Sequence, residues 1–340
     1  MQHTLQQIAA RIKQASSVVI LTHTRPDGDA FGGALALSRA LDFLKIPNQV
    51  CDESNIPSNL TFINGIEKVQ KKPEMDYDLL VMLDCSDEQR LGTLSETFFL
   101  AKRKKIDTIN VDHHVSNKLF AKYNYMRPCS ANCMHVAALI EYLGAPIDKI
   151  TAEYLLIGLL TDSGNFSHDD VTEETMMLAA KLIKAGADIR YCNEMLFKRQ
   201  SKARAALYAR TMSGMRFYHE DRFAVIVVTK KNMEDCGADV GMTEGFVDFP
   251  LNVDTVEIAA SVLEMKKGQY KISLRSKHYA DVNRLAGVYG GGGHVRAAGC
   301  MLFGDLEEVL DKLSYTASQY LEELLIYLVN RAENSARFSF

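Results

Sequence analysis

The chain has 340 residues, of which 47% are hydrophobic and 24% are charged, and its formal net charge is −4. This composition is ordinary for a soluble globular protein, and the length is sufficient for two domains. The net charge excludes a global attraction to nucleic acid, and no apolar run reaches the roughly 18 residues that a membrane span needs.

The N-terminal sequence MQHTLQQIAARIKQ is polar and predicts an amphipathic helix, not a signal peptide. The seven cysteines are scattered along the chain. This pattern is typical of reduced thiols, so we expect a cytoplasmic protein without a membrane partner.

The first half of the chain alternates strand-like and helix-like segments. Strands are predicted for residues 17–23, 78–84 and 107–112. The first two are continuous apolar runs, as in strands buried on both faces of a sheet. Helices are predicted for 34–45, 133–144 and 152–162. The alternation predicts a parallel sheet covered by helices.

The second half has a different pattern. A basic stretch without strand character precedes strands predicted for 223–229, 256–265 and 270–276. DVNRLAGVYGGGGHVRAAGCML then predicts a helix, a glycine loop and a strand, and a last helix spans about 305–325. The rest of the chain has no core pattern, and we expect it to be disordered. We therefore expect an N-terminal domain at 1–190, a linker at 191–212, a smaller domain at 213–325 and a tail at 326–340.

Four motifs of the first half carry side chains that can bind metal or move protons. They are THTRPDGDA (22–30), LDCSD (83–87), INVDHHVSN (109–117) and LLTDSGNF (159–166). Each has an ordinary alternative: an aspartate after a strand or helix often caps a turn, and adjacent histidines are often merely exposed. No single motif decides between these explanations.

The positions of the motifs favour a shared site. Three of them follow predicted strands, and ligands of an open parallel sheet bind beyond the carboxyl ends of the strands. The carboxylates brought together would be Asp27, Asp29, Asp84 and Asp162. Charges about 4 Å apart interact by roughly 4 kcal/mol at an effective dielectric of about 20, so these groups cannot all stay ionised without cations. Two divalent ions would balance them, and oxygen and imidazole ligands favour Mn²⁺ or Mg²⁺.

In this order and spacing, the four motifs resemble those of the DHH phosphoesterase family. SLRS (273–276) and GGGGHVRAAG (290–299) resemble the companion DHHA1 domain, and the glycine-rich motif points to the bacterial nano-RNase (oligoribonuclease) and pAp phosphatase branch. The resemblance implies an α/β fold: a parallel-sheet DHH domain with flanking helices, a linker helix, and a smaller α/β DHHA1 domain. It also implies an active site in the cleft between the domains.

The resemblance assigns roles to individual residues. The metal ligands would be His23, Asp27, Asp29, Asp84, His113 and Asp162. They would hold two Mn²⁺ ions, with Mg²⁺ or another divalent cation as the alternative. Asp84 would bridge the ions, His114 would face the substrate phosphate, and Asp112 would orient a histidine. Phosphate contacts in the DHHA1 domain would come from Arg275, Gly291, Gly292, Gly293 and His294.

The function implied is that of a manganese-dependent phosphoesterase. It would hydrolyse very short oligoribonucleotides and 3′-phosphoadenosine 5′-phosphate (pAp), the latter to AMP, through two-metal activation of a bridging water. Its partners would be short single-stranded RNA or DNA or a nucleotide bisphosphate, and a homodimer is compatible with the sequence. The alternatives are a cyclic dinucleotide (c-di-AMP type) or linear dinucleotide phosphodiesterase and, outside enzymes, a nucleotide-sensing module. None of the six metal ligands is replaced, which favours an enzyme.

Overall fold

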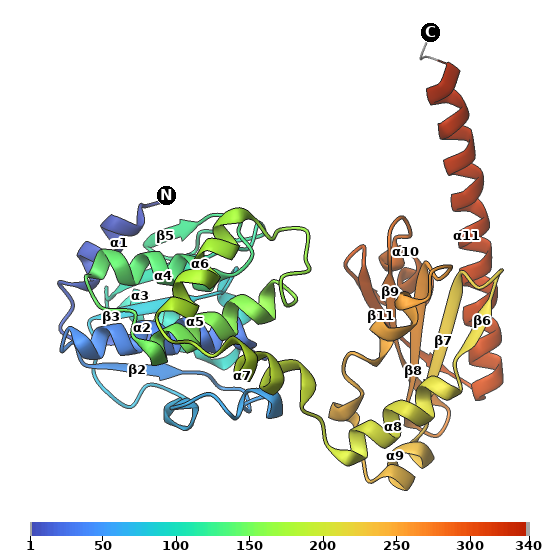
Figure 1. Cartoon of the computed structure of the whole chain (residues 1–340), viewed down its shortest axis with the longest axis horizontal. Helices are drawn as coiled ribbons and strands as arrows, with labels where there is room; N and C mark the ends of the chain where they lie inside the picture. Colours follow the sequence, from blue (N-terminus) through green and yellow to red (C-terminus); the bar gives the residue numbers. More distant parts are fainter. Residues whose placement is uncertain (1, 338–340) are drawn as a thin grey trace. The chain divides into compact units, whose positions relative to one another are not determined.

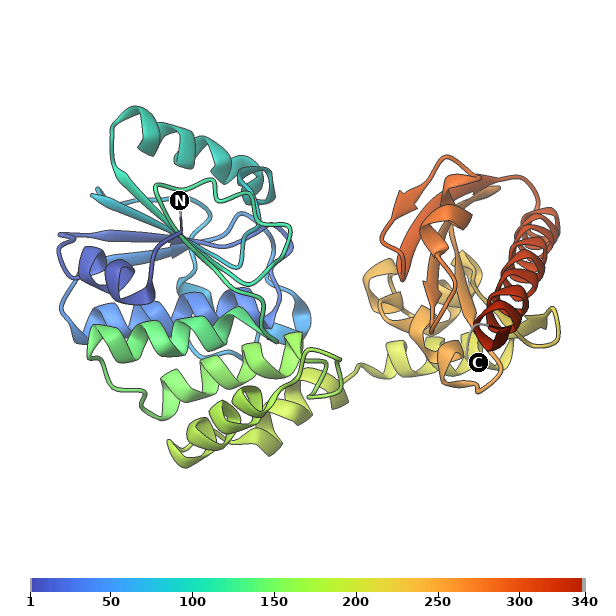
Figure 2. The ribbon, with the colours of Figure 1, turned by 90° about the horizontal axis from the view of Figure 1, so that it is seen from above.

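The computed structural model describes residues 2–337, and the chain divides into two compact units. The first unit is Met1–Arg199 and the second is Gln200–Phe340. The division falls within residues 191–212, the range that the sequence predicts to be a linker. Figures 1 and 2 show each unit as a sheet with packed helices, so the predicted fold of two α/β domains is confirmed.

The first unit contains a five-stranded parallel sheet with the order β2-β1-β3-β4-β5. Its strands are β1 (Val18–Leu21), β2 (Asn48–Cys51), β3 (Leu79–Leu83), β4 (Asp107–Asp112) and β5 (Tyr123–Met126). The three predicted strands lie at the centre. The edge strands β2 and β5 are short and only partly buried, so they lack the apolar runs by which the central strands are recognised.

Helices cover both faces of this sheet. The helices of the unit are α1 (Leu5–Ile12), α2 (Gly28–Phe43), α3 (Ser95–Arg103), α4 (Asn132–Leu143), α5 (Lys149–Asp162), α6 (Glu173–Lys184) and α7 (Ile189–Asn193), of which α6 and α7 pack against α5. Alternate residues of a strand point to opposite faces. Accordingly, Val18 and Ile20 share a core with α1, α2, α4 and α5, while Val19 and Leu21 pack with Phe98 of α3. Figure 2 shows α3 on the opposite side of the sheet from α2 and α4.

The second unit contains a six-stranded mixed sheet with the order β10-β11-β9-β8-β7-β6. Its strands are β6 (Arg216–Tyr218), β7 (Phe223–Val228), β8 (Ile258–Lys266), β9 (Gln269–Ser276), β10 (Gly292–Gly293) and β11 (Ala297–Phe303). Its helices are α8 (Lys202–Ser213), α9 (Lys230–Cys236), α10 (Val282–Gly287) and α11 (Leu306–Arg337). Only β7 and β8 pair in parallel; the other neighbours are antiparallel.

Alternate side chains of β7 again point to two different clusters, one on each face of the sheet. Val225 faces a core that includes residues of α10 and α11, whereas Ile226 packs with Leu207 of α8 and Met233 of α9. Helix α11 extends to Arg337, beyond the end at about 325 and into the tail expected to be disordered. No glycine or proline interrupts the sequence from 306 to 337, so nothing local stops the helix. Residues 338–340 of the predicted tail lie outside the described residues.

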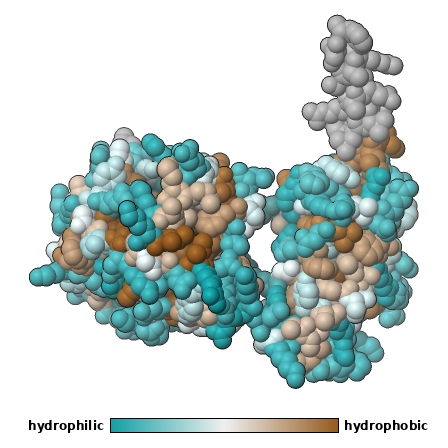
Figure 3. All heavy atoms as spheres, in the orientation of Figure 1, coloured by the Kyte–Doolittle hydropathy of each residue, from teal (hydrophilic) through white to brown (hydrophobic). Residues whose placement is uncertain are grey.

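Hydrophilic side chains cover much of the visible face of both units, with apolar side chains showing between them (Figure 3). Within residues 2–337, no helix is long and apolar enough to cross a membrane.

Candidate active site

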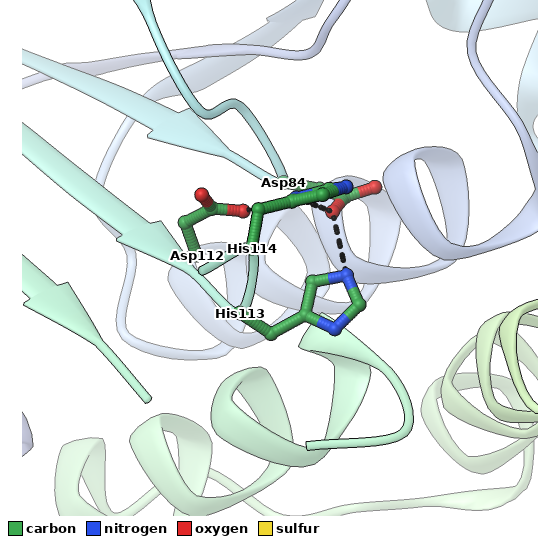
Figure 4. A group of neighbouring side chains, drawn as sticks. All are labelled: Asp84, Asp112, His113 and His114. Carbon is green, nitrogen blue, oxygen red and sulfur yellow. Dashed lines mark hydrogen bonds and ion pairs between the residues drawn. The ribbon is translucent and has the colours of Figure 1, made fainter. Parts of the chain in front are cut away.

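The sequence motifs meet at one edge of the parallel sheet. His23 comes two residues after β1, Asp84 directly follows β3, and His113 directly follows β4. These strands are parallel neighbours, so their carboxyl ends bring the three side chains together. Figure 4 shows Asp84 beside the side chains that end β4.

Two helices bring the remaining aspartates to the same place. Asp27 and Asp29 begin α2, and Asp162 is the last residue of α5. Helices α2 and α5 approach closely at Gly32, where a Cβ atom would lie 2.3 Å from the carbonyl oxygen of Tyr154. A larger residue at this position would force the helices apart and move the two acidic ends with them.

The first ligand group contains His23, Asp27 and Asp84, whose ligand atoms lie within 4.8 Å of one another. His23 Nε2 is 3.3 Å from Asp84 Oδ2 and 3.9 Å from Asp27 Oδ2. Asp27 also caps α2, because its Oδ1 accepts hydrogen bonds from the backbone N–H groups of Asp29 and Ala30. Asp27 can therefore cap the helix through Oδ1 and still face His23 through Oδ2.

The second ligand group contains Asp29, His113 and Asp162, again within 4.8 Å. His113 Nε2 lies 3.2 Å from Asp162 Oδ2 and 3.3 Å from Asp84 Oδ1. The two oxygens of Asp84 therefore face different groups, Oδ2 towards His23 and Oδ1 towards His113. This is the arrangement that a carboxylate shared by two cations requires.

Backbone carbonyls orient both imidazoles. Nδ1 of His23 donates to the carbonyl oxygen of Thr24 at 3.0 Å, and Nδ1 of His113 donates to that of Cys129 at 2.8 Å. A proton on Nδ1 leaves the Nε2 lone pair of a neutral imidazole free to bind a cation. Both Nε2 atoms face the carboxylates.

Unpartnered buried atoms provide a test of whether the residues fit metal ions. Asp84 Oδ1 and His113 Nε2 are buried, and neither has a hydrogen-bond partner among the described residues. Asp84 also has a φ of 55°, the left-handed region that non-glycine residues seldom adopt. A carboxylate oxygen and an imidazole nitrogen without partners are the donors that a divalent cation takes, so the residues fit such ions.

The pKa values of three carboxyls show the repulsion in the metal-free centre. Burial and the charge of Asp84 raise the pKa of Asp29 to about 8. Burial and the charges of Asp29, Asp27 and Asp84 raise the pKa of Asp162 to about 9, and burial and Asp84 also raise the pKa of Asp27. Without cations, Asp29 and Asp162 hold protons at neutral pH, as expected when carboxylates are crowded out of water.

The pKa values of Asp84 and of the two histidines His23 and His113 shift in the direction opposite to the effect of burial. Burial would raise the pKa of Asp84, but the imidazoles of His113 and His23 hold it well below its usual range. Burial would lower the pKa of His23, but Asp84 and Asp27 raise it to about 9. The pKa of His113 is likewise raised by Asp84, against the effect of burial. In the metal-free centre, protons thus occupy places that cations could take.

His114 differs from the other two histidines because a carboxylate orients it. Its Nδ1 donates to Asp112 Oδ1 at 2.8 Å, and this bond raises the pKa of His114 although burial opposes the shift. Asp112 is fully buried, and its Oδ2 accepts a hydrogen bond of 2.6 Å from Asn117. Asp112 therefore fixes the ring of His114, whose side chain is 36% exposed.

The second unit places its predicted residues around β9 and β11. Arg275 lies on β9, where its Nε is 3.3 Å from Asp248 Oδ1. His294 is exposed and belongs to a tight turn closed by backbone hydrogen bonds with Ala297. The backbone N–H groups of three glycines in the run, Gly290, Gly291 and Gly293, already donate within the unit. These three backbone donors are therefore already used within the unit.

Several supporting residues had no recognisable signal in the sequence. They include Thr24 and Cys129, which act through backbone carbonyls that any residue could supply. Arg296 is exposed, and its guanidinium donates to the carbonyl oxygens of His278 and Ala280 and so holds that loop. Only Asn117 could have been suspected, since it stands three residues after the histidine pair.

Comparison with known proteins agrees with this geometry. The pattern of the DHH family, N-terminal domain, matches residues 17–159, and that of the DHHA1 domain matches residues 221–323. The bifunctional oligoribonuclease and PAP phosphatase NrnA of Thermus thermophilus is 31% identical over 305 residues, which cover 87% of each chain. A probable bifunctional oligoribonuclease and PAP phosphatase NrnA of Streptococcus mutans is 26% identical, covering 86% of this chain and 91% of that protein.

A solved structure is similar over nearly the whole chain. The crystal structure of an exopolyphosphatase-related protein from Bacteroides fragilis is 27% identical, has a TM-score of 0.83, and covers 94% of this chain and 95% of that one. With the family matches and the relative from Thermus thermophilus, this settles the family. The chain belongs to the DHH family of phosphoester hydrolases, with a DHH domain followed by a DHHA1 domain.

Proposed function

We propose that the protein is a manganese-dependent phosphoesterase that hydrolyses very short oligoribonucleotides and converts pAp to AMP. The observation that carries the proposal is the pair of ligand groups joined by Asp84, because its two oxygens face His23 and His113 separately. Relatives named as bifunctional oligoribonuclease and PAP phosphatase, similar over most of the chain, support this substrate class.

His23, Asp27 and Asp84 would hold one divalent cation, and Asp84, Asp29, His113 and Asp162 the other. Bound there, the pair would lower the pKa of water and offset the charge of a phosphate. Oxygen and imidazole donors without a thiolate favour Mn²⁺ over a structural zinc ion.

His114 would contact the substrate phosphate. Its Nδ1 proton is held by Asp112, so its Nε2 is available to a phosphate oxygen. Because the pKa of His114 is raised, the imidazolium form can donate there and stabilise charge that develops on a non-bridging oxygen. Asp112 would act through His114, by fixing its tautomer and the direction of its ring.

Residues of the second unit would bind another phosphate of the substrate. Arg275 is partly exposed, and its pairing with Asp248 uses Nε, so Nη2 remains for a phosphate oxygen. His294 and the glycines Gly291, Gly292 and Gly293 are close in sequence to β11, the strand paired with β9. A second phosphate contact would explain a preference for very short substrates or for a nucleotide bisphosphate.

The structure describes all seven cysteines as free thiols, which supports a place in the cytoplasm.

The experiment is a Mn²⁺-supplemented assay of the full chain on 5′-labelled oligoribonucleotides of graded length, with pAp and a cyclic dinucleotide in parallel. We expect the fastest turnover on substrates of about two to five nucleotides and release of AMP from pAp. Faster hydrolysis of the cyclic dinucleotide would favour the alternative phosphodiesterase. Tight nucleotide binding without turnover of any substrate would contradict the proposal.

A further inference from the structure

Asn132 is a buried residue that belongs to neither ligand group. It is the first residue of α4, and its exposed fraction is 0%. Neither Oδ1 nor Nδ2 of its side chain has a hydrogen-bond partner within the described part of the chain. An amide offers two donors and an acceptor, so its whole hydrogen-bonding capacity is unused.

Two other buried asparagines of the same unit show the normal situation. Asn110 donates to the carbonyl oxygens of Met82 and Cys85. Asn124 donates to the carbonyl oxygen of Ala121 and accepts from the N–H group of the same residue. Leaving a buried amide unpaired costs roughly 1–3 kcal/mol, so a bound molecule that paired with it would recover that cost.

Asn132 adjoins the second ligand group. Its backbone N–H donates to Asp29 Oδ2 at 2.5 Å, and the next N–H of the helix, that of Cys133, donates to Asp29 Oδ1 at 2.9 Å. Covalent geometry keeps the amide atoms of a side chain within about 5 Å of their own backbone nitrogen. The Asn132 amide therefore lies within about 8 Å of Asp29 Oδ2.

The chemistry of the surroundings selects the kind of ligand. The side chain is neutral, so it adds hydrogen-bond donors without adding charge to a centre already crowded with carboxylates. The N-terminal end of α4 is also the positive end of a twelve-residue helix. A donor at this end suits an anionic oxygen better than it suits a cation.

We propose that the side-chain amide of Asn132 donates a hydrogen bond from Nδ2 to a non-bridging oxygen of the substrate phosphate held at the metal centre. This inference rests on the proposed function, since it names a further group that contacts the same phosphate. His114 follows the end of β4 and Asn132 begins α4, so the two groups would come from different elements.

The test compares Asn132→Leu, which is nearly the same size but has no donor, with Asn132→Ala and with the control Asn124→Ala. Inorganic phosphate is the probe, and its affinity is measured by the thermal shift of the Mn²⁺-loaded protein and by inhibition of pAp hydrolysis. For both Asn132 variants we expect phosphate affinity and kcat/KM to fall about 10-fold or more, which corresponds to about 1.4 kcal/mol. Mn²⁺ affinity should be unchanged.

Stability separates this role from a structural one. Asn132→Leu should leave the melting temperature of the metal-free protein unchanged or raise it, because an unpaired amide is removed. Asn124→Ala should lower that temperature and leave phosphate affinity unchanged. Wild-type phosphate affinity in Asn132→Leu, or a loss of Mn²⁺ binding in that variant, would overturn the inference. A wild-type protein that binds phosphate with Mn²⁺ but hydrolyses neither substrate would overturn the proposed function instead, and the binding assay would still test Asn132.

Discussion

Asp84 Oδ1 lies 3.3 Å from His113 Nε2, and both atoms are buried without a hydrogen-bond partner among the described residues. The pair is held from both sides, because Asp84 follows β3 and His113 follows the neighbouring strand β4. Two good ligands held at ion-pair distance without a hydrogen bond are characteristic of a site built for a third partner.

The first prediction concerns this carboxylate. Asp84→Asn keeps the shape of the side chain but removes the charge that two cations would share. We expect the variant to lose Mn²⁺ binding and to lose activity by more than the roughly 10- to 100-fold typical of groups that only support a ligand. Metal content and pAp hydrolysis would be measured together. Asp87→Asn is the matched control, since Asp87 belongs to the same motif but pairs with Lys118; equal losses in both variants would contradict a special role for Asp84.

The second prediction is that metal binding releases protons. In the metal-free centre the pKa of Asp29 is raised to about 8 by burial and Asp84, and that of His23 to about 9 by Asp84 and Asp27 against burial. Both therefore carry protons at neutral pH that a bound cation must displace. Mn²⁺ affinity should rise steadily from about pH 6 to about pH 9. Calorimetric titration in two buffers of different ionisation enthalpy would count the protons, and a pH-independent affinity would contradict the prediction.

The third prediction concerns the stability of the metal-free protein. Asp162 has a pKa of about 9 in the folded state, against 3.8 as the ordinary value, so the folded state binds more protons than the unfolded state between these values. Its stability must therefore fall as pH rises through that window. The melting temperature in EDTA should drop between about pH 6 and about pH 9. Asp162→Asn, which mimics the protonated carboxyl, should weaken this dependence; an unchanged slope would show that Asp162 does not contribute to it.

Much of this site could be predicted from the sequence because its signals are local. Asp84 and His113 stand directly after apolar runs, and the carboxyl ends of parallel strands meet at one edge of a sheet. The place of Asp162 in the site is harder to predict from the sequence, because this residue ends a helix. Only the packing of α5 against α2 brings it to the same place. The predicted parallel sheet and the family were correct for the same reason: buried strands and ordered motifs are visible in a single sequence.

Other features depend on tertiary contacts that no local pattern reveals. The edge strand β5 has little apolar character and forms because β4 supplies a partner. The carbonyl of Cys129 orients His113 across sixteen positions of sequence, and any residue could provide it. The unpaired amide of Asn132 is equally invisible, because an asparagine at the start of a helix is ordinarily explained by capping preferences.

The fourth prediction separates His114 from the metal ligands. His114→Gln should lower kcat about 100-fold, within the range expected for a lost donor to developing charge, while Mn²⁺ binding is retained. Asp112→Asn should reduce kcat less and should shift its pH dependence to lower pH, because the bond to Asp112 is the main cause of the raised pKa of His114. Metal content and pH–rate profiles would be measured for both. Loss of Mn²⁺ from His114→Gln would instead identify the residue as a ligand.

The fifth prediction uses two neighbouring glycines of the second unit, one that the packing of the unit requires and one that we expect to leave room for substrate. A Cβ atom at Gly291 would lie 2.2 Å from the carbonyl oxygen of Gly299, whereas at Gly292 the nearest atom is Asn283 Oδ1 at 3.6 Å. Gly291→Ala should therefore lower the melting temperature. Gly292→Ala should leave it unchanged but raise KM for pAp several-fold, since the new methyl group would stand where the backbone approaches a phosphate. Unchanged KM in Gly292→Ala, with the fold intact, would remove this part of the loop from the substrate contacts.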